Sequence, residues 1–199
     1  MSDTEPNVDN VGVIDRIKQV YDLGTVSDEA LNQALSGYGE GRDWVLKRYQ
    51  RFENPELRIG THSGNLEGIN GFTETADGVK LIALQVGELR KLENTNSASR
   101  ITEDYGGDVP VKPTLTIRQW YEGFGVEETL HWLQDQGIEG LVSLPPSKKR
   151  IQPMSGSGVK YLTQPHEFEG LVLTGQFFKQ KYRTNPLEKL EGFVRNKLD

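Results

Sequence analysis

The chain has 199 residues and no cysteine, and its 29 acidic and 23 basic residues give a net charge of −6 at pH 7. The length predicts one domain with at most a small appendage, and the missing cysteines exclude disulfides, thiolate zinc sites, iron–sulfur clusters and cysteine nucleophiles. No run of about 18 apolar residues occurs, and the acidic start MSDTEPNVDN predicts neither a secretory signal nor a transit peptide. We therefore expect a protein of the cytoplasm, or of a particle assembled there, with no membrane partner.

The charge is unevenly distributed along the chain. Residues 1–147 hold 24 acidic and 13 basic residues, whereas residues 148–199 hold 5 and 10. A positive C-terminal quarter suits an acidic partner, nucleic acid or the chain's own acidic N-terminal portion. The last interpretation is favoured, because segments of opposite charge commonly coexist on one soluble domain.

Helical patterns dominate the N-terminal quarter. Residues 1–9 are polar and acidic, and we expect a flexible arm there. Apolar residues at helical spacing within 10–54 predict three helices, at 10–24, 27–38 and 42–53. Gly37, Gly39 and Gly41 are expected to separate the second helix from the third, because each glycine costs about 1 kcal/mol in a helix interior. These residues predict an N-terminal three-helix unit.

After Pro55 the pattern favours strands. β-Branched and aromatic residues alternate in 70–75 and 79–86 around a glycine-containing turn, which predicts a β-hairpin. Residues 93–113 are rich in Asn, Ser, Gly, Asp and Pro. A loop of this length inside a domain is often functional, so we expect a binding surface there.

The C-terminal half mixes both periods. In chain order it predicts a strand at 114–118, a helix at 126–136, a short strand at 138–144, an exposed loop at 145–158 and a strand at 168–178. Asn185 as an N-cap, with Pro186 in the first helical position, predicts a C-terminal helix. The expected fold is α+β: the three-helix unit, then an α+β domain over 55–199 with a mostly antiparallel sheet, one internal helix and the C-terminal helix.

Two sets of residues are candidate metal ligands. Glu128, His131 and Asp135 share one face of the expected 126–136 helix, so two carboxylates and an imidazole lie within two turns. Glu-x-x-His occurs in di-iron proteins, but that use requires a second copy, which the sequence lacks. A solvated helix face is the favoured interpretation.

The second set lies at the start of the expected 168–178 strand. It consists of His166, Glu167 and Glu169, and alternation would place the two carboxylates on one face for acid–base or metal chemistry. A solvated strand edge is the favoured interpretation.

Basic residues concentrate in the C-terminal quarter. The candidate binding residues are Lys148, Lys149, Arg150, Lys179, Lys181 and Arg183. Aromatic residues interleaved with them resemble the pattern of single-strand nucleic-acid binders, although an acidic protein partner is favoured somewhat over nucleic acid.

No set of catalytic residues is assembled by the sequence, and no cofactor is implied. The leading hypothesis is a non-enzymatic structural or assembly protein, one subunit of a virion-like or other multisubunit particle. Its partners would be protein subunits, including copies of itself, bound through the arm, the long loops and the basic segment. The first alternative is a metal-dependent hydrolase using either candidate set. The second is a nucleic-acid-binding module formed by residues 148–183.

Overall fold

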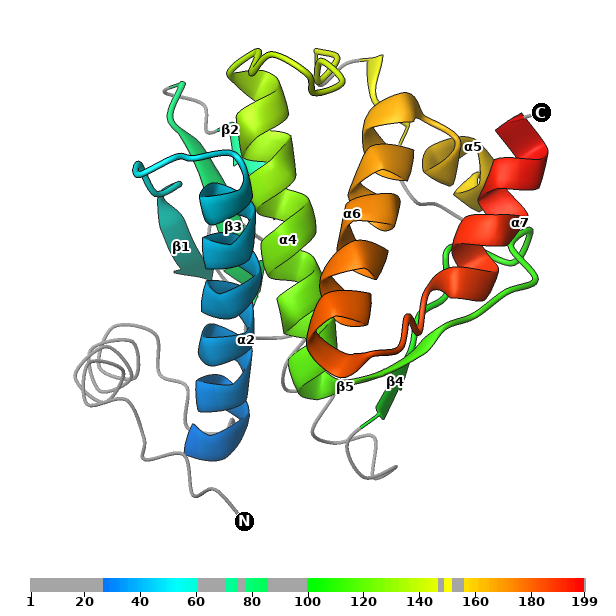
Figure 1. The fold of residues 1–199 in the computed structure, drawn as a ribbon, viewed down its shortest axis with the longest axis horizontal. Coiled ribbons are helices and arrows are strands. Elements are labelled where there is room, and N and C mark those ends of the chain that lie inside the picture. The colour runs from blue at the N-terminus through cyan, green and yellow to red at the C-terminus, as the bar shows by residue number, and fades with distance from the viewer. Residues whose placement is uncertain are drawn as a thin grey trace.

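The fold is built around one central helix. A computed structural model describes residues 27–60, 71–74, 78–85, 100–146, 149–151 and 156–198. Helix α4 (Ile117–Asp135) lies between α2 (Asp28–Arg48) and α6 (Pro165–Tyr182), as Figure 1 shows. The shorter helices α5 (Gly158–Leu162) and α7 (Glu188–Leu198) pack against α6. No helix in the described ranges is long and apolar enough to cross a membrane.

The strands form two small sheets. Their bounds are β1 (Leu57–Gly60), β2 (Gly71–Glu74), β3 (Lys80–Gln85), β4 (Arg100–Thr102) and β5 (Thr114–Thr116). The first sheet has the order β1-β3-β2, with β1 parallel and β2 antiparallel to β3, and β4 pairs with β5 antiparallel. The predicted hairpin pairing is therefore confirmed. The expected mostly antiparallel sheet is wrong, because the described residues are helix-rich and their three-stranded sheet is mixed.

The expected three-helix unit is also wrong. Residues predicted as two helices separated by glycines form the single helix α2, which Ser27 caps by accepting a hydrogen bond from the Ala30 amide. The helix continues through the glycines, and α4 packs directly on two of them, Gly37 and Gly41: a Cβ at Gly41 would lie 2.2 Å from the Glu122 carbonyl oxygen. The arm at 1–9 and the helix expected at 10–24 lie outside the described residues.

Helix α4 begins nine residues earlier than expected. Thr116 and Gln119 form a capping box, in which each side chain accepts a hydrogen bond from the other residue's amide. The sequence pattern suggested a later start because Gly123 and Gly125 interrupt it. The strand expected at 138–144 is also wrong: this segment is irregular, and Gly137 and Gly140 have positive φ angles.

The strand expected at 168–178 is wrong, because this segment lies within helix α6. This error has more consequence than the others. Apolar residues occupy both alternating and helical positions there, so a period of two fits by chance. Pro165 at the start of the helix was the missed signal. The C-terminal helix is confirmed as α7, and the Asn185 side chain accepts a hydrogen bond from the Leu187 amide at 2.9 Å.

Two apolar clusters flank α4. The first joins α2, β3 and α4, and includes Leu31, Tyr38, Ile82 and Tyr121. The second joins α4 to α6 and α7, and includes Leu130, Phe178, Leu190 and Val194. The polar side chains described next interrupt the contact between α4 and α6.

Candidate metal centre

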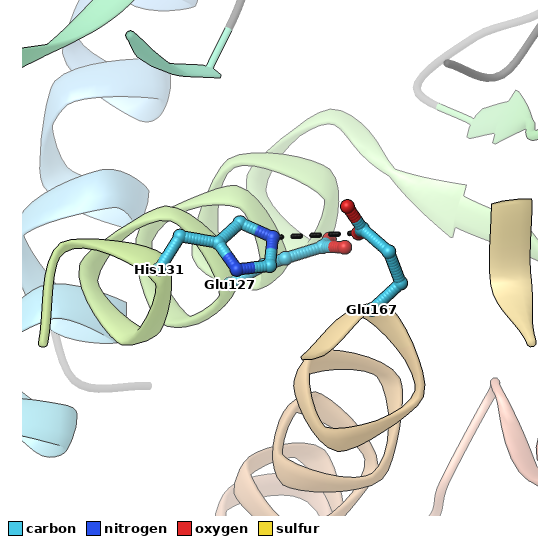
Figure 2. A group of neighbouring side chains, drawn as sticks. All are labelled: Glu127, His131 and Glu167. Atoms are coloured by element: carbon cyan, nitrogen blue, oxygen red, sulfur yellow. Dashed lines mark ion pairs between the residues drawn. The ribbon is translucent and has the colours of Figure 1, made fainter. Parts of the chain in front are cut away.

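Three side chains from two helices meet between α4 and α6. Glu127 and His131 are four residues apart on α4, which places them on one face, and Glu167 extends toward them from the first turn of α6 (Figure 2). One ligand atom from each residue lies within 4.8 Å of the others. Glu167 also lies at the positive end of the α6 dipole, which favours its ionised form.

Glycines make room for two of the carboxylates beside this centre. A Cβ at Gly170 of α6 would lie 3.2 Å from Glu127 Cγ, so that position holds the Glu127 side chain closely. A Cβ at Gly71 would lie 3.0 Å from a Glu128 carboxylate oxygen, and its φ of +140° suits glycine. The Phe72 amide donates a hydrogen bond to Glu128.

A buried amide orients the imidazole of His131. Gln134 Nε2 donates to Glu169 Oε2 at 2.7 Å, which leaves Gln134 Oε1 facing His131 Nδ1 at 2.8 Å. Nδ1 must therefore carry a proton and donate it. His131 Nε2 then faces Glu167 Oε2 at 3.3 Å. Metal-binding histidines are held in this way, with the second ring nitrogen fixed by a neighbour.

Glu167 is buried, and one of its two carboxylate oxygens lacks a hydrogen bond among the described residues. Its side chain is 8% exposed, its Oε1 lies 3.2 Å from His166 Nε2, and its Oε2 lies 3.3 Å from His131 Nε2. Neither Glu167 Oε2 nor His166 Nε2 has a hydrogen-bond partner of acceptable geometry among the described residues. Buried polar atoms without partners are rare and mark an absent water or ion, or a reactive group.

The ionisation of the cluster is strongly shifted. Burial raises the pKa of Glu127 to about 8, with the Glu167 and Glu128 charges adding to the effect, and burial raises that of Glu128 to about 7. Burial alone would lower the pKa of His131, but Glu167 and the neighbouring carboxylates raise it to about 10. Burial likewise opposes ionisation of Glu167, but the two imidazoles hold its pKa at about 2. In the metal-free protein, protons therefore balance the buried charges.

Two tyrosines lie beside the carboxylates. Burial and the charges of Glu127 and Glu167 raise the pKa values of Tyr105 and Tyr161 well above their ordinary value, so both phenols stay neutral. Asp108 accepts hydrogen bonds from the Gly158 and Val159 amides at 3.1 Å each, which fixes the start of α5 and with it Tyr161. The long 93–113 loop thus contributes to the centre through its described part.

The structure brings together some residues from both candidate ligand sets and places others elsewhere. His131 of the first set and Glu167 of the second meet, Glu128 and His166 lie next to them, and Glu127 joins them. Two proposed ligands lie elsewhere: Asp135 pairs with Lys80 at 2.7 Å, and Glu169 accepts hydrogen bonds from Gln134 and the Val142 amide. Glu127 was missed, although its spacing of four from His131 is the signal that identifies it.

The candidate basic residues that the structure describes lie at 149–150 and at the C-terminal end of α6. Lys181 pairs with Glu40 and with Glu122, the latter at 2.7 Å. Lys149, Lys179 and Arg183 are exposed, Arg150 is partly buried and donates to the Pro145 carbonyl, and Lys148 lies outside the described residues.

Comparisons with protein-family models, with curated proteins and with solved structures gave no match to this chain. The functional argument therefore depends on the geometry of the centre.

Proposed function

We propose that the protein is a metal-dependent enzyme in which Glu127, His131 and Glu167 bind one divalent transition-metal ion. The observation that carries the proposal is the Glu167 carboxylate, which is buried, faces an oriented imidazole, and has one oxygen without a hydrogen bond among the described residues. A bound cation would satisfy that oxygen.

The charge and chemistry of the ligands support this choice. Two carboxylates and one neutral imidazole carry a charge of −2, which one divalent ion neutralises inside a protein that otherwise disfavours buried charge. The mixed oxygen and nitrogen set suits Zn²⁺, Mn²⁺ or Fe²⁺ better than Ca²⁺, which takes six to eight oxygen ligands.

The number of ligands favours catalysis over a structural role. Three protein ligands leave a coordination position open, whereas structural zinc sites are closed by four. When bound, the ion would supply Lewis-acid chemistry and activate a water, so hydrolysis is the reaction class we propose. A cavity next to Glu127 provides room for a substrate.

Titration of the metal-free full-length chain with Co²⁺, followed by visible absorption and calorimetry, tests the proposal. We expect one equivalent to bind, and E167Q and H131Q to lose binding while keeping the wild-type circular dichroism spectrum. D135N is the matched control, because Asp135 lies on the same helix but pairs with Lys80, and it should bind as the wild type does. Absence of binding by the wild type, or equal binding by E167Q, would overturn the proposal.

The assembly role and the nucleic-acid role remain predictions. The assembly hypothesis depends on the arm at 1–9, the long loops and the basic C-terminal segment, and the arm lies outside the described residues. One observation favours a partner surface: Phe52, at the end of the α2 segment, is 96% exposed. Light scattering after size exclusion, compared between the wild type and F52S, tests it. A concentration-independent monomer mass for both proteins would remove this support.

A further inference from the structure

A cavity of about 140 Å³ lies between α4 and α6 beside the candidate metal centre. Glu103, Glu127 and Glu128 line it together with two tyrosines. The apolar part of the wall, which is only a little larger than the polar part, is formed by Leu115, Phe124, Leu162, Leu171, Phe178 and Leu187. A cavity that combines apolar walls with convergent polar groups is the usual form of a small-molecule site.

The cavity spans two layers of the contact between the helices. In one layer Glu127 lies over Gly170, and in the next Gly123 lies over Thr174, where a Cβ on the glycine would meet Thr174 Cγ2 at 3.2 Å. Gly123 precedes Glu127 by four residues, so the two layers are roughly 6 Å apart along α4.

Thr174 supplies the second independent observation. It lines the cavity and is only 4% exposed, yet its hydroxyl has no hydrogen-bond partner among the residues that the structure describes. Threonines inside helices commonly donate to the carbonyl one turn earlier, and this one does not. A bound molecule would provide the missing partner.

The size and charge of the cavity restrict its occupant. A cavity of about 150 Å³ holds a benzene molecule, so this one accommodates roughly one six-membered ring. The apolar part of the wall disfavours a charged body, because the charge would lose its hydration there. A neutral molecule satisfies this condition.

We propose that this cavity is the substrate pocket and that it takes a small neutral molecule with a ring-sized apolar body and a hydroxyl or carbonyl oxygen. The inference rests on the proposed function, because the oxygen would occupy the open coordination position beside Glu127. Thr174 is the specificity residue at the other end of the pocket, where it would hydrogen-bond a polar edge of the occupant.

The test uses the Co²⁺-loaded full-length protein and three probes of matched shape: benzyl alcohol, benzylamine and benzoate. Binding is followed by the change in Co²⁺ absorption and by ligand-observed NMR. We expect benzyl alcohol to bind about tenfold more tightly than either charged probe. T174V should leave benzyl alcohol binding unchanged but weaken the binding of 4-hydroxybenzyl alcohol, whose second oxygen would reach Thr174, about threefold. It should keep wild-type Co²⁺ affinity and keep or raise the Tm, because it removes an unpartnered buried hydroxyl. G123L should abolish binding by filling the cavity.

Each outcome separates the two proposals. A wild-type Co²⁺ spectrum that does not respond to benzyl alcohol, or equal affinity for the three probes, would overturn the pocket and leave the metal centre standing. Equal binding of 4-hydroxybenzyl alcohol by T174V and the wild type would also overturn it, and this variant keeps the test valid if G123L fails to fold. A wild-type protein that takes up no Co²⁺ would overturn the proposed function, and the substrate assignment with it.

Discussion

The two long neighbours of α4 pack against it in opposite ways. Along α2, glycines bring the two backbones together: a Cβ at Gly41 would lie 2.2 Å from the Glu122 carbonyl oxygen, and one at Gly125 would lie 2.3 Å from the Tyr38 carbonyl oxygen. Along α6, polar side chains and a cavity lie between the helices. The α2 contact leaves no space for a ligand, whereas the α6 contact keeps space at the expense of packing.

The contact between α4 and α6 itself holds two buried carboxylates that differ in their hydrogen bonding. Glu122 is fully buried and accepts hydrogen bonds from Arg118 at 3.1 Å, Lys181 at 2.7 Å and Tyr182 at 2.8 Å. Glu167 is almost as buried, but one of its oxygens accepts no hydrogen bond within the described part of the chain. A saturated buried charge indicates a structural role, while an unsaturated one indicates a site that binds something.

The largest expected effect comes from breaking the α2 contact. G41V places a side chain where backbone lies, and since backbone cannot move aside as a flexible side chain can, we expect a loss of at least about 3 kcal/mol in the free energy of unfolding. G39A is the matched control, because no heavy atom lies within 4 Å of its Cβ position, and it should be neutral or stabilising. Urea unfolding compares them. Similar stabilities for the two variants would contradict the close backbone packing.

On the α6 side, the stability of the metal-free protein should depend on pH. The folded pKa of Glu127 is about 8 and that of Glu128 about 7, both above their ordinary value of 4.5, so the native state binds these protons more tightly than the unfolded state. Their contribution to the free energy of unfolding is full below pH 4.5 and is lost as the pH rises to about 8.

Urea unfolding of the metal-free protein at a series of pH values measures this dependence. The stability should fall from pH 5 to pH 8, and E127Q should reduce the slope because the amide does not titrate. A wild-type stability that is constant or rises over this range would contradict the raised pKa values of the two carboxyl groups.

An intermediate effect is expected at Glu122. E122A leaves Lys181 and Tyr182 without their shared acceptor, and because these partners are partly exposed we expect a cost of about 2 kcal/mol, at the low end for a broken buried pair. E56A removes an exposed partner of Arg58 and should cost less than about 1 kcal/mol. Thermal unfolding of both variants makes the comparison, and equal losses would refute the structural role of Glu122.

The smallest effect is expected at Gln134, which contacts the metal-binding residue His131 rather than the metal ion itself. Q134A removes the acceptor that orients His131 Nδ1, and loss of such a partner typically lowers metal affinity by about 10-fold to 100-fold. Co²⁺ titration measures the change. An unaltered affinity would mean that packing alone positions the imidazole.

Local rules predicted several elements correctly. The β2–β3 pairing and the C-terminal helix follow from turn and cap residues, whose effect extends over only a few positions. Helix α6 was mistaken for a strand because its apolar residues face α4 on one side and α5 and α7 on others, which removes the amphipathic signal. That error separated Glu167 from His131 by placing them on different kinds of element.

The sequence by itself determined the ligand types, the one-turn spacing of Glu127 and His131, the Ser27 cap of α2, and the absence of cysteine chemistry. Only the tertiary structure decided that α2 continues through its glycines. The reason is the close contact with α4, a helix some 80 residues later in the chain. It alone brought Glu167 to His131 across 36 positions. Contacts of this range depend on how helices pack, and that information is not present in any local window of residues.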